Sequence, residues 1–230
     1  MKEFLIDSMF FGTVVSLAAY ETGLLLKKKF KLAILNPLLI GTICVMAVLL
    51  LLKVEYKHYN QSAKYLSYLL TPATVCLALP LYQQLELLKK NLKAVVSGIT
   101  AGVLASLASV LLLARLFSLS HEQYVTLLPK SITTAIGMGV SRELGGIETI
   151  TVAVIIITGI LGNILAEIVF RIFRIQDPIA RGLSLGTASH AIGTAKAMEI
   201  GEIEGAMSSL AIAVAGLLTV LGASVFAGLM

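Results

Sequence analysis

Charged residues are scarce in this chain. Asp, Glu, Lys and Arg make up 13% of its 230 residues, about half the share found in soluble domains. So few charges cannot solvate the surface of a soluble globular domain, and a hydrophobic content of 57% excludes a disordered chain, which needs low hydrophobicity and high charge. The mean hydropathy of +0.93 indicates that lipid is the solvent. At about 20 residues per span, the length allows seven or eight membrane helices.

The sequence also lacks the patterns of metal sites and enzymes. Its two cysteines, Cys44 and Cys76, lie in apolar stretches without metal-ligand spacing, and nothing supports a disulfide between them. It contains no nucleophile elbow, Walker loop or metal-ligand cluster. The net charge is +5, but the basic residues form short clusters between apolar stretches, which is typical of membrane loops and not of nucleic-acid surfaces. We therefore expect no enzyme activity, metal, cofactor or nucleic-acid partner.

Eight apolar stretches predict an all-α integral membrane protein, a bundle of seven to eight transmembrane or re-entrant helices in one polytopic domain over residues 1–230. The first stretch contains Asp7 and Glu21 and lacks an Ala-x-Ala-like end, so we expect a first span and no cleavable signal peptide. If all eight stretches cross the membrane, the Lys and Arg residues divide evenly between its two sides, and the positive-inside rule gives no orientation. If Tyr124–Val140 enters and leaves on one side, the basic clusters share a face, so the rule favours a re-entrant Tyr124–Val140. We expect Lys27–Lys31 and Lys89–Lys93 to be cytoplasmic. The stretches are Leu5–Leu26, Leu32–Leu52, Tyr65–Leu85, Leu92–Phe117, Tyr124–Val140, Thr149–Phe173, Leu183–Ile200 and Gly205–Leu229.

Several of these stretches contain residues that interrupt or begin a helix. Proline removes a backbone donor and clashes one turn back, and broken backbone at membrane depth is tolerated only against protein or a wet cavity. Asn36-Pro37 is interpreted as the capped start of the second span. The stretch Tyr65–Leu85 and the helix after it weakly resemble the stretch Leu183–Ile200 and the last helix. This likeness predicts an internal repeat with halves of about 1–118 and 119–230, as in many transporters. The predicted structural breaks are Asn36, Pro37, Thr71, Pro72, Pro80, Pro129, Gly186 and Gly193.

Two helices carry small residues at every fourth position, which allows close approach of helix backbones in a membrane. We interpret both stripes as packing surfaces inside the bundle, with a sliding surface as the alternative. The stripes are Ser97, Ala101, Ala105 and Ser109, and Ala211, Ala215, Thr219, Ala223 and Ala227.

Lys130 and Lys196 are lysines within segments of membrane-span length, where a charge is costly and usually marks an ion or substrate path. Helical spacing places each lysine on one face with hydroxyls and glycines, and neither has an obvious acidic partner in its own segment. Such a stripe suits a small anion with hydroxyl or keto oxygens, whereas the alternative is a lysine that snorkels to the headgroups. The predicted substrate-binding residues are Lys130, Ser131, Thr134, Thr187, Ser189, His190, Thr194 and Lys196.

Two residues are candidates for carrying a co-transported proton. His190 has an ordinary pKa near neutrality, and its alternative role is a hydrogen-bonded packing histidine. Glu167 is the second candidate, and its alternative role is an i, i+4 ion pair with Arg171.

Four motifs of this sequence resemble the LrgB/CidB family of bacterial inner-membrane proteins. They are Asn36-Pro37-Leu38-Leu39-Ile40, Leu70-Thr71-Pro72-Ala73-Thr74-Val75 with Ala78-Leu79-Pro80-Leu81-Tyr82, Leu128-Pro129-Lys130-Ser131-Ile132-Thr133-Thr134-Ala135, and Gly186-Thr187-Ala188-Ser189-His190-Ala191-Ile192-Gly193-Thr194-Ala195-Lys196-Ala197. The last motif is the most specific, and the likeness covers nearly the whole chain.

The resemblance implies a multi-pass protein of the bacterial plasma membrane and two competing functions. One is antiholin-like modulation of murein hydrolase activity and autolysis, together with a small holin-like membrane partner, LrgA or CidA. The other is transport, because plastid relatives are glycolate/glycerate translocators and bacterial pairs resemble pyruvate carriers. The two cationic, hydroxyl-lined, broken segments favour a carrier of pyruvate, lactate, glycolate or glycerate that works by an elevator or rocking motion. We expect proton coupling and a homodimer, and a structural scaffold for the partner is the least favoured alternative.

Overall fold

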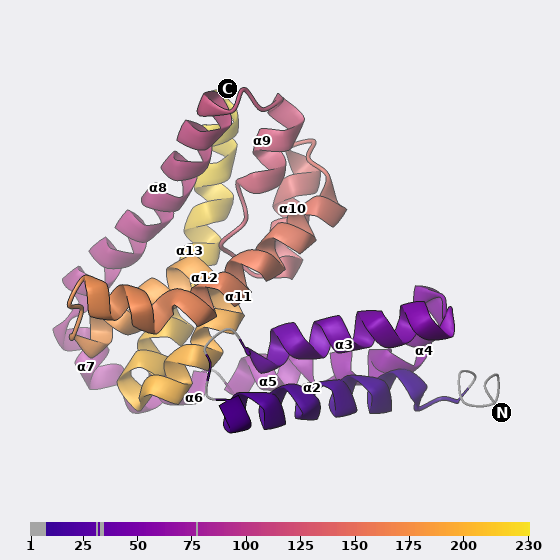
Figure 1. The fold of residues 1–230 in the computed structure, drawn as a ribbon. Coiled ribbons are helices and arrows are strands. Elements are labelled where there is room, and N and C mark those ends of the chain that lie inside the picture. Colours follow the sequence, from indigo (N-terminus) through magenta and orange to yellow (C-terminus); the bar gives the residue numbers. More distant parts are fainter. Residues whose placement is uncertain (1–7, 31, 33–34, 77) are drawn as a thin grey trace. The chain divides into compact units, whose positions relative to one another are not determined.

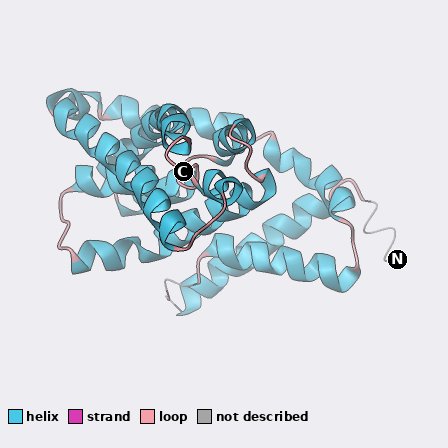
Figure 2. Cartoon of the chain, turned by 90° about the horizontal axis from the view of Figure 1, so that it is seen from above, coloured by secondary structure: helices cyan, strands magenta, loops and turns pink. Residues whose placement is uncertain are grey.

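The computed structural model describes residues 8–30, 32, 35–76 and 78–230, and in these residues the regular structure is helical (Figures 1 and 2). The chain divides into two compact units, Met1–Cys76 and Leu77–Met230. The repeat boundary expected near residue 118 therefore falls inside the second unit, and the repeat stays a prediction. The helices are α2 (Phe11–Phe30), α3 (Pro37–Leu52), α4 (Tyr56–Ser67), α5 (Leu70–Cys76), α6 (Ala78–Gln83), α7 (Leu85–Lys90), α8 (Leu92–Leu116), α9 (His121–Leu127), α10 (Thr134–Glu143), α11 (Glu148–Ile172), α12 (Pro178–Ile200) and α13 (Glu202–Ala227).

In the first unit, α2 packs against α3 and α4. Asn36 caps α3, because its side-chain oxygen accepts hydrogen bonds from the backbone N–H groups of Leu38 at 2.8 Å and Leu39 at 3.3 Å. Pro37 occupies the first helical turn, where its missing N–H costs nothing. The prediction of a capped helix start at this pair is confirmed, although the helix begins at Pro37 and not at Leu32.

The proline-containing stretch Tyr65–Leu85 is interrupted, as predicted. Helix α4 ends at Ser67 and α5 begins at Leu70, so the first interruption precedes Thr71 and Pro72, which lie in the first turn of α5. Pro80 lies within α6, and the next interruption follows it at Gln84. Both prolines thus occupy early helix positions, where the ring does not clash with a preceding turn.

The long helices of the second unit are α8, α11 and α13. In the described part of the chain these three have the length and composition of membrane spans, and Tyr56–Ser67 together with Leu70–Gln83 adds a fourth if this bent pair is one span. The second unit has two ends. The Gly201 side holds the first residues of α8 and α13 and the last of α11, and the Ser120 side holds their opposite ends, where Arg115 donates to the carbonyl of Leu229 at 2.7 Å.

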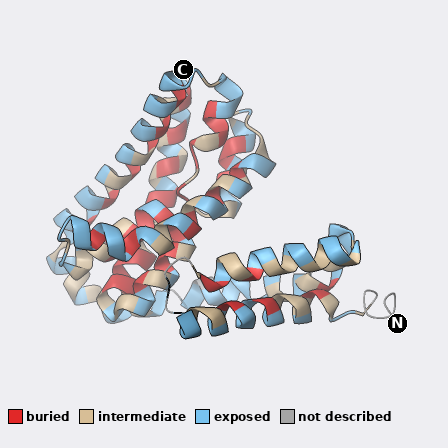
Figure 3. Ribbon diagram, in the orientation of Figure 1, coloured by how far each residue is buried: buried red, intermediate tan, exposed pale blue. Residues whose placement is uncertain are grey.

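The core of the second unit lies between α8, α12 and α13, where buried residues gather in Figure 3. The predicted packing stripe of α13 is confirmed, because its five residues, Ala211, Ala215, Thr219, Ala223 and Ala227, are each at most 7% exposed. The prediction for α8 is wrong, since Ser97, Ala101, Ala105 and Ser109 are exposed. Helix α8 instead buries the adjacent face, with Val95, Ile99, Val103, Leu107 and Val110, because branched side chains fill more space beside the alanines of α13 than a second small-residue stripe would.

Helix α12 is a hairpin of two short arms, whereas the sequence predicted that Leu183–Ile200 is a span broken at Gly186 and Gly193. Its backbone leaves helical geometry at Ser189 and His190. Gly186 and Thr194 both contact Ser208 of α13: a Cβ on Gly186 would lie 2.5 Å from the Ser208 carbonyl oxygen, and the hydroxyls of Thr194 and Ser208 are 2.7 Å apart. Eight residues of straight helix span about 12 Å, so the two arms must lie side by side.

The stretch Tyr124–Val140 folds back on itself in the same way. Helix α9 ends at Leu127, the chain turns through residues 128–133, and α10 runs from Thr134 to Glu143. The hydroxyl of Thr151 in α11 bonds to the carbonyl of Thr126 in α9 at 2.9 Å and to the hydroxyl of Ser141 in α10 at 2.7 Å. Residues 126 and 141 therefore lie at one level, which agrees with the re-entrant interpretation.

Candidate functional site

The two hairpins meet on α11 at Ile155, the α12 hairpin through its tip and the other through Gly137 in the first turn of α10. The imidazole Nε2 of His190 donates to the Ile155 carbonyl at 3.0 Å, which fixes the proton on that ring nitrogen. From the other hairpin, Gly137 packs on the same residue, since a Cβ there would lie 2.5 Å from the Ile155 Cδ1. One turn along α11, Gly159 leaves room for the imidazole, because its own Cβ would lie 2.8 Å from the ring.

Helix α8 also contacts both hairpins. Gly98, Gly102 and Ser106 recur at four-residue intervals on this helix, where Gly98 faces Leu183 and Gly102 faces Thr187 of the α12 hairpin. One turn further, the α8 hydroxyl of Ser106 accepts a hydrogen bond from the Lys130 ammonium. The two hairpins therefore lie on consecutive turns of one helix face.

Lys130 is held at the tip of the first hairpin by neutral oxygens. Its Nζ donates to the hydroxyl of Ser106 at 3.2 Å and to that of Ser131 at 3.0 Å, and these hydroxyls are 3.1 Å apart. Within the described residues, no carboxylate forms an ion pair with this ammonium. An ammonium surrounded by hydroxyls can take up an anion with no carboxylate of the protein to displace.

Lys196 occupies a different environment, near the end of the second α12 arm. Its Nζ lies 2.5 Å from Glu167 of α11 and 3.6 Å from Glu199 of its own segment. The expectation that it has no acidic partner in its segment is therefore wrong, because one helical turn brings Glu199 alongside. The cavity that Lys196 lines does not include Lys130. Among the described residues, Lys130 and Lys196 therefore do not line the same cavity. That both lysines bind one anion stays a prediction.

The predicted hydroxyls are placed around the hairpin tips. Ser189 packs against Gly162 of α11, and Thr187 bonds to the Leu183 carbonyl at 2.8 Å. Thr194 bonds to the carbonyl of His190 at 3.1 Å, in the first turn of the second arm. Thr134 is the first residue of α10 and is half-buried.

The predicted helical stripes are wrong as continuous faces. Lys130 precedes α10, so it does not share a helix face with Thr134. Ser189 interrupts the face drawn through Gly186, Gly193 and Lys196. The predicted breaks at Gly186 and Gly193 are also wrong, because both glycines lie in helical arms on either side of the reversal. Their role is close packing, of Gly186 on α13 and of Gly193 on the carbonyl of Leu185 in the opposite arm.

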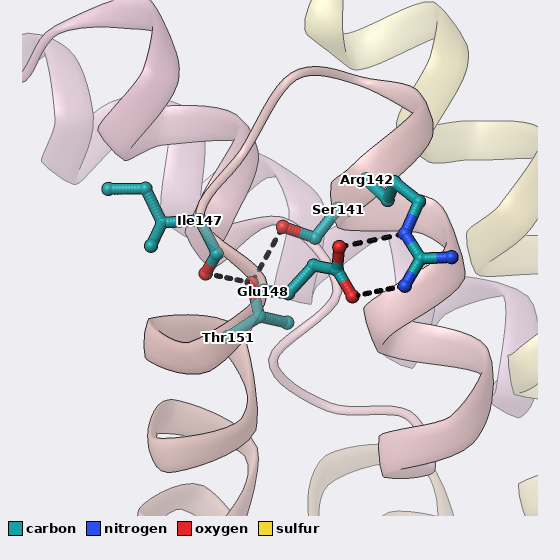
Figure 4. Close-up of polar contacts among 5 residues, drawn as sticks. All are labelled: Ser141, Arg142, Ile147, Glu148 and Thr151. Atoms are coloured by element: carbon teal, nitrogen blue, oxygen red, sulfur yellow. Dashed lines mark hydrogen bonds and ion pairs between the residues drawn. The ribbon is translucent and has the colours of Figure 1, made fainter.

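A buried hydroxyl cluster holds the first hairpin to α11 (Figure 4). The hydroxyl of Thr151 donates to the hydroxyl of Ser141 at 2.7 Å. The backbone N–H of Ile147 donates to the hydroxyl of Thr126 at 2.8 Å. Beside this cluster, the guanidinium of Arg142 donates two hydrogen bonds of 2.7 Å to Glu148, which raise the pKa of Arg142. The cluster fixes the level at which α10 returns, and hence the depth of the tip.

Several residues that contact the two hairpins were not predicted from the sequence. Ser106, Ile155, Gly159 and Ser208 contribute a hydroxyl, a carbonyl or an absent side chain to residues far away in the chain. Serines and glycines are common in membrane helices, so neither spacing nor composition singles these out.

These features define a polytopic membrane protein in which two helical hairpins meet between long apolar helices. The chain belongs to the LrgB-like family, which it matches over residues 16–229. It is 41% identical to "Holin-like protein CidB" of Staphylococcus epidermidis over 197 residues, 86% of each chain. It is 38% identical to "Antiholin-like protein LrgB" of Bacillus subtilis over 220 residues, 95% of each chain, and 39% identical to "Holin-like protein CidB" of Staphylococcus aureus, again over 86% of each. No solved structure matches the chain.

Proposed function

We propose that the protein is a membrane carrier of small monocarboxylates such as pyruvate, lactate, glycolate or glycerate. The observation that supports this most is the position of Lys130, whose ammonium lies at the tip of one re-entrant hairpin, bonded to hydroxyls. Discontinuous segments that meet inside the bilayer are the usual site of substrate in secondary transporters. A carboxylate placed there gains a charge-assisted hydrogen bond from the lysine.

The backbone of both hairpins adds to the attraction for an anion. Helix α10 begins at Thr134 and the second arm of α12 begins after His190, so each starts at a hairpin tip. The free N–H groups and the positive end of the dipole at a helix N-terminus favour a negative group. Helix α10 has 10 residues, about 15 Å of helix, which is half of a hydrocarbon core of about 30 Å. The tips are therefore expected near the midplane.

The remaining predicted residues take secondary positions in this proposal. Ser131 contacts the carboxylate together with Lys130, while Thr134, Thr187, Ser189 and Thr194 offer hydroxyls around the tips. Lys196 lies on the path from the Gly201 side. His190 carries the coupled proton, and Glu167, through its ion pair with Lys196, is the second candidate.

A second candidate function is holin-like or antiholin-like control of murein hydrolase activity, and the names of the relatives favour it over transport. On this candidate the chain acts with a small LrgA/CidA-like membrane protein, and a homodimer is the expected assembly in either case. A pore modulator has no need for a half-buried ammonium that is bonded to hydroxyls and not to a carboxylate. We therefore retain the carrier as the proposal that the geometry supports better.

Ligand-dependent thermal stability of the purified protein tests the proposal. A ligand that binds only the folded state at about 100 times its Kd stabilises it by about 2.7 kcal/mol. We expect pyruvate, lactate, glycolate or glycerate to raise the melting temperature of the wild type and to have no effect on Lys130→Met. Lys53→Met, which removes an exposed lysine of the first unit, is the control. If no small carboxylate stabilises the wild type, while deleting the protein alters murein hydrolase activity in cells, the second candidate replaces the first.

A further inference from the structure

A cavity of about 580 Å³ opens on the Gly201 side of the second unit, where α11 ends and the α12 hairpin has its base. Arg171 and Arg174 line it from the end of α11 and the following turn, and Arg181 lines it from the first arm of α12. It is separate from the hairpin tips, since neither Lys130 nor His190 is among its lining residues. Its volume falls in the range of small-ligand sites, about 300–1,000 Å³.

The charges in this cavity are unbalanced in favour of anions. Four cationic side chains face two carboxylates, and both carboxylates, Glu167 and Glu199, are paired with Lys196. In the part of the chain that the structure describes, no ion pair joins Arg171, Arg174 or Arg181 to another residue. Three guanidinium groups around one cavity match the oxygens of a phosphate, which accepts bidentate hydrogen bonds.

Arg181 is held in place for such a contact. Its Nε donates to the carbonyl of Ile175 at 2.8 Å, and its guanidinium lies 5.6 Å from the ring centroid of Phe170. One hydrogen bond and one cation–π contact fix the plane of the group. The terminal guanidinium nitrogens of Arg181 are then the donors for a ligand. Because the side chain is already held, it loses less conformational entropy when the ligand binds.

The position of the cavity suggests the source of the phosphate. Helix α11 has 25 residues, about 37 Å of helix against a hydrocarbon core of about 30 Å, so its last turn reaches the headgroups. Apolar side chains of Phe170, Ile175 and Ile200 line the same cavity as the arginines. That combination fits a lipid, whose phosphate meets the cations while its glycerol and acyl ends meet the apolar side chains.

The charge distribution also assigns the leaflet. The Ser120 side of the second unit has only Arg115 and Arg142 at its helix ends, so the positive-inside rule places the Gly201 side in the cytoplasm. The Lys and Arg residues on the Gly201 side are Lys89, Lys90, Lys93, Arg171, Arg174, Arg181 and Lys196. Cationic pockets between membrane helices on the cytoplasmic side suit anionic headgroups. We propose that this cavity binds the phosphate of an anionic phospholipid of the cytoplasmic leaflet.

Native mass spectrometry of the full-length protein with added lipid tests this. The variants are Arg174→Gly and the double variant Arg171→Gln with Arg174→Gly. Glycine suits position 174, where φ is 54°, so the first substitution removes the guanidinium without straining the backbone. Lys53→Gly is the matched control, because Lys53 is also a cation at a helix end with φ of 50° but does not line the cavity.

Phosphatidylglycerol should bind the wild type and Lys53→Gly equally, about fivefold more weakly to Arg174→Gly, and about thirtyfold more weakly to the double variant. Phosphatidylcholine should show no such dependence. Equal binding of both lipids, or binding unchanged by the arginine variants, overturns the proposal. It is also overturned if inorganic phosphate binds with the same arginine dependence while the lipid does not, or if pyruvate displaces the lipid, which would assign the cavity to a soluble anion.

Discussion

His190 and Ile155 lie 35 residues apart in the sequence, and the imidazole Nε2 of the first donates to the carbonyl of the second at 3.0 Å. This bond ties the tip of the α12 hairpin to the first third of α11, at the residue against which the other hairpin also packs through Gly137. A single residue of a long helix thus contacts both hairpins, and the proposed function depends on this arrangement.

The reversal in α12 makes a topological prediction. In a background without Cys44 and Cys76, single cysteines introduced as Asp177→Cys and Glu202→Cys should react with an impermeant thiol reagent from the same side of the membrane, because both positions lie at the base of the hairpin. Glu143→Cys should react from the opposite side. A straight α12 would place positions 177 and 202 on opposite sides, so labelling from opposite sides would refute the hairpin.

The packing of His190 over α11 predicts the effect of Gly159→Ala. The added Cβ would lie 2.8 Å from the imidazole, and overpacking of this kind costs about 1–3 kcal/mol of unfolding free energy. Gly139→Ala is the control, since nothing lies within 4 Å of its Cβ and alanine stabilises a helix by about 0.5–1 kcal/mol relative to glycine. Thermal unfolding in detergent should therefore move in opposite directions for the two variants. If Gly159→Ala destabilises the protein no more than Gly139→Ala does, the packing of His190 against Gly159 is contradicted.

The backbone at His190 predicts an inverted order of two substitutions. Its φ of 41° lies in the region that favours glycine, and a residue held there by force costs about 1–3 kcal/mol. His190→Gly and His190→Ala both lose the imidazole, but only the glycine variant relieves the backbone. Glycine should therefore be the more stable variant, the reverse of its usual position against alanine in a helix. An alanine variant more stable than the glycine one would mean that the reversal at 189–190 is absent.

The hydroxyl cluster of Figure 4 predicts that Thr151→Val destabilises the first hairpin. The variant removes the bonds to the Thr126 carbonyl and the Ser141 hydroxyl and leaves buried polar groups unpaired, which costs about 1–3 kcal/mol. Thr149→Val, at an exposed position two residues earlier in α11, should be close to neutral. Denaturation in detergent measures both, and equal stabilities would show that the cluster does not hold α10 to α11.

Much of the helical architecture could be predicted from the sequence. The long apolar stretches of α8, α11 and α13 have span length, and Asn36-Pro37 carries its own capping chemistry. These features depend on residues close together in the chain, so composition and spacing reveal them. The reversal within Tyr124–Val140 could also be predicted, from the balance of Lys and Arg residues between the two sides of the membrane.

The hairpin of α12 could not be predicted in this way. Its 23 residues match the length of a span, and the sequence predicts the breaks at Gly186 and Gly193. The reversal is set instead by contacts with other helices: Ser208 of α13 receives both arms, and the glycines of α11 accept the tip. The ion pair of Lys196 with Glu167 was hidden for the same reason, since the partner lies on another helix.

Uptake of labelled pyruvate into vesicles that contain only the purified protein tests the carrier most directly. The account predicts saturable uptake that an imposed proton gradient accelerates, that Lys130→Met abolishes, that Lys196→Met reduces and that Lys53→Met leaves unchanged, with all four proteins equally folded. Lactate, glycolate and glycerate should compete according to their fit. If Lys130→Met transports like the wild type, or if none of these four acids enters the vesicles with or without the small holin-like partner, the carrier is contradicted.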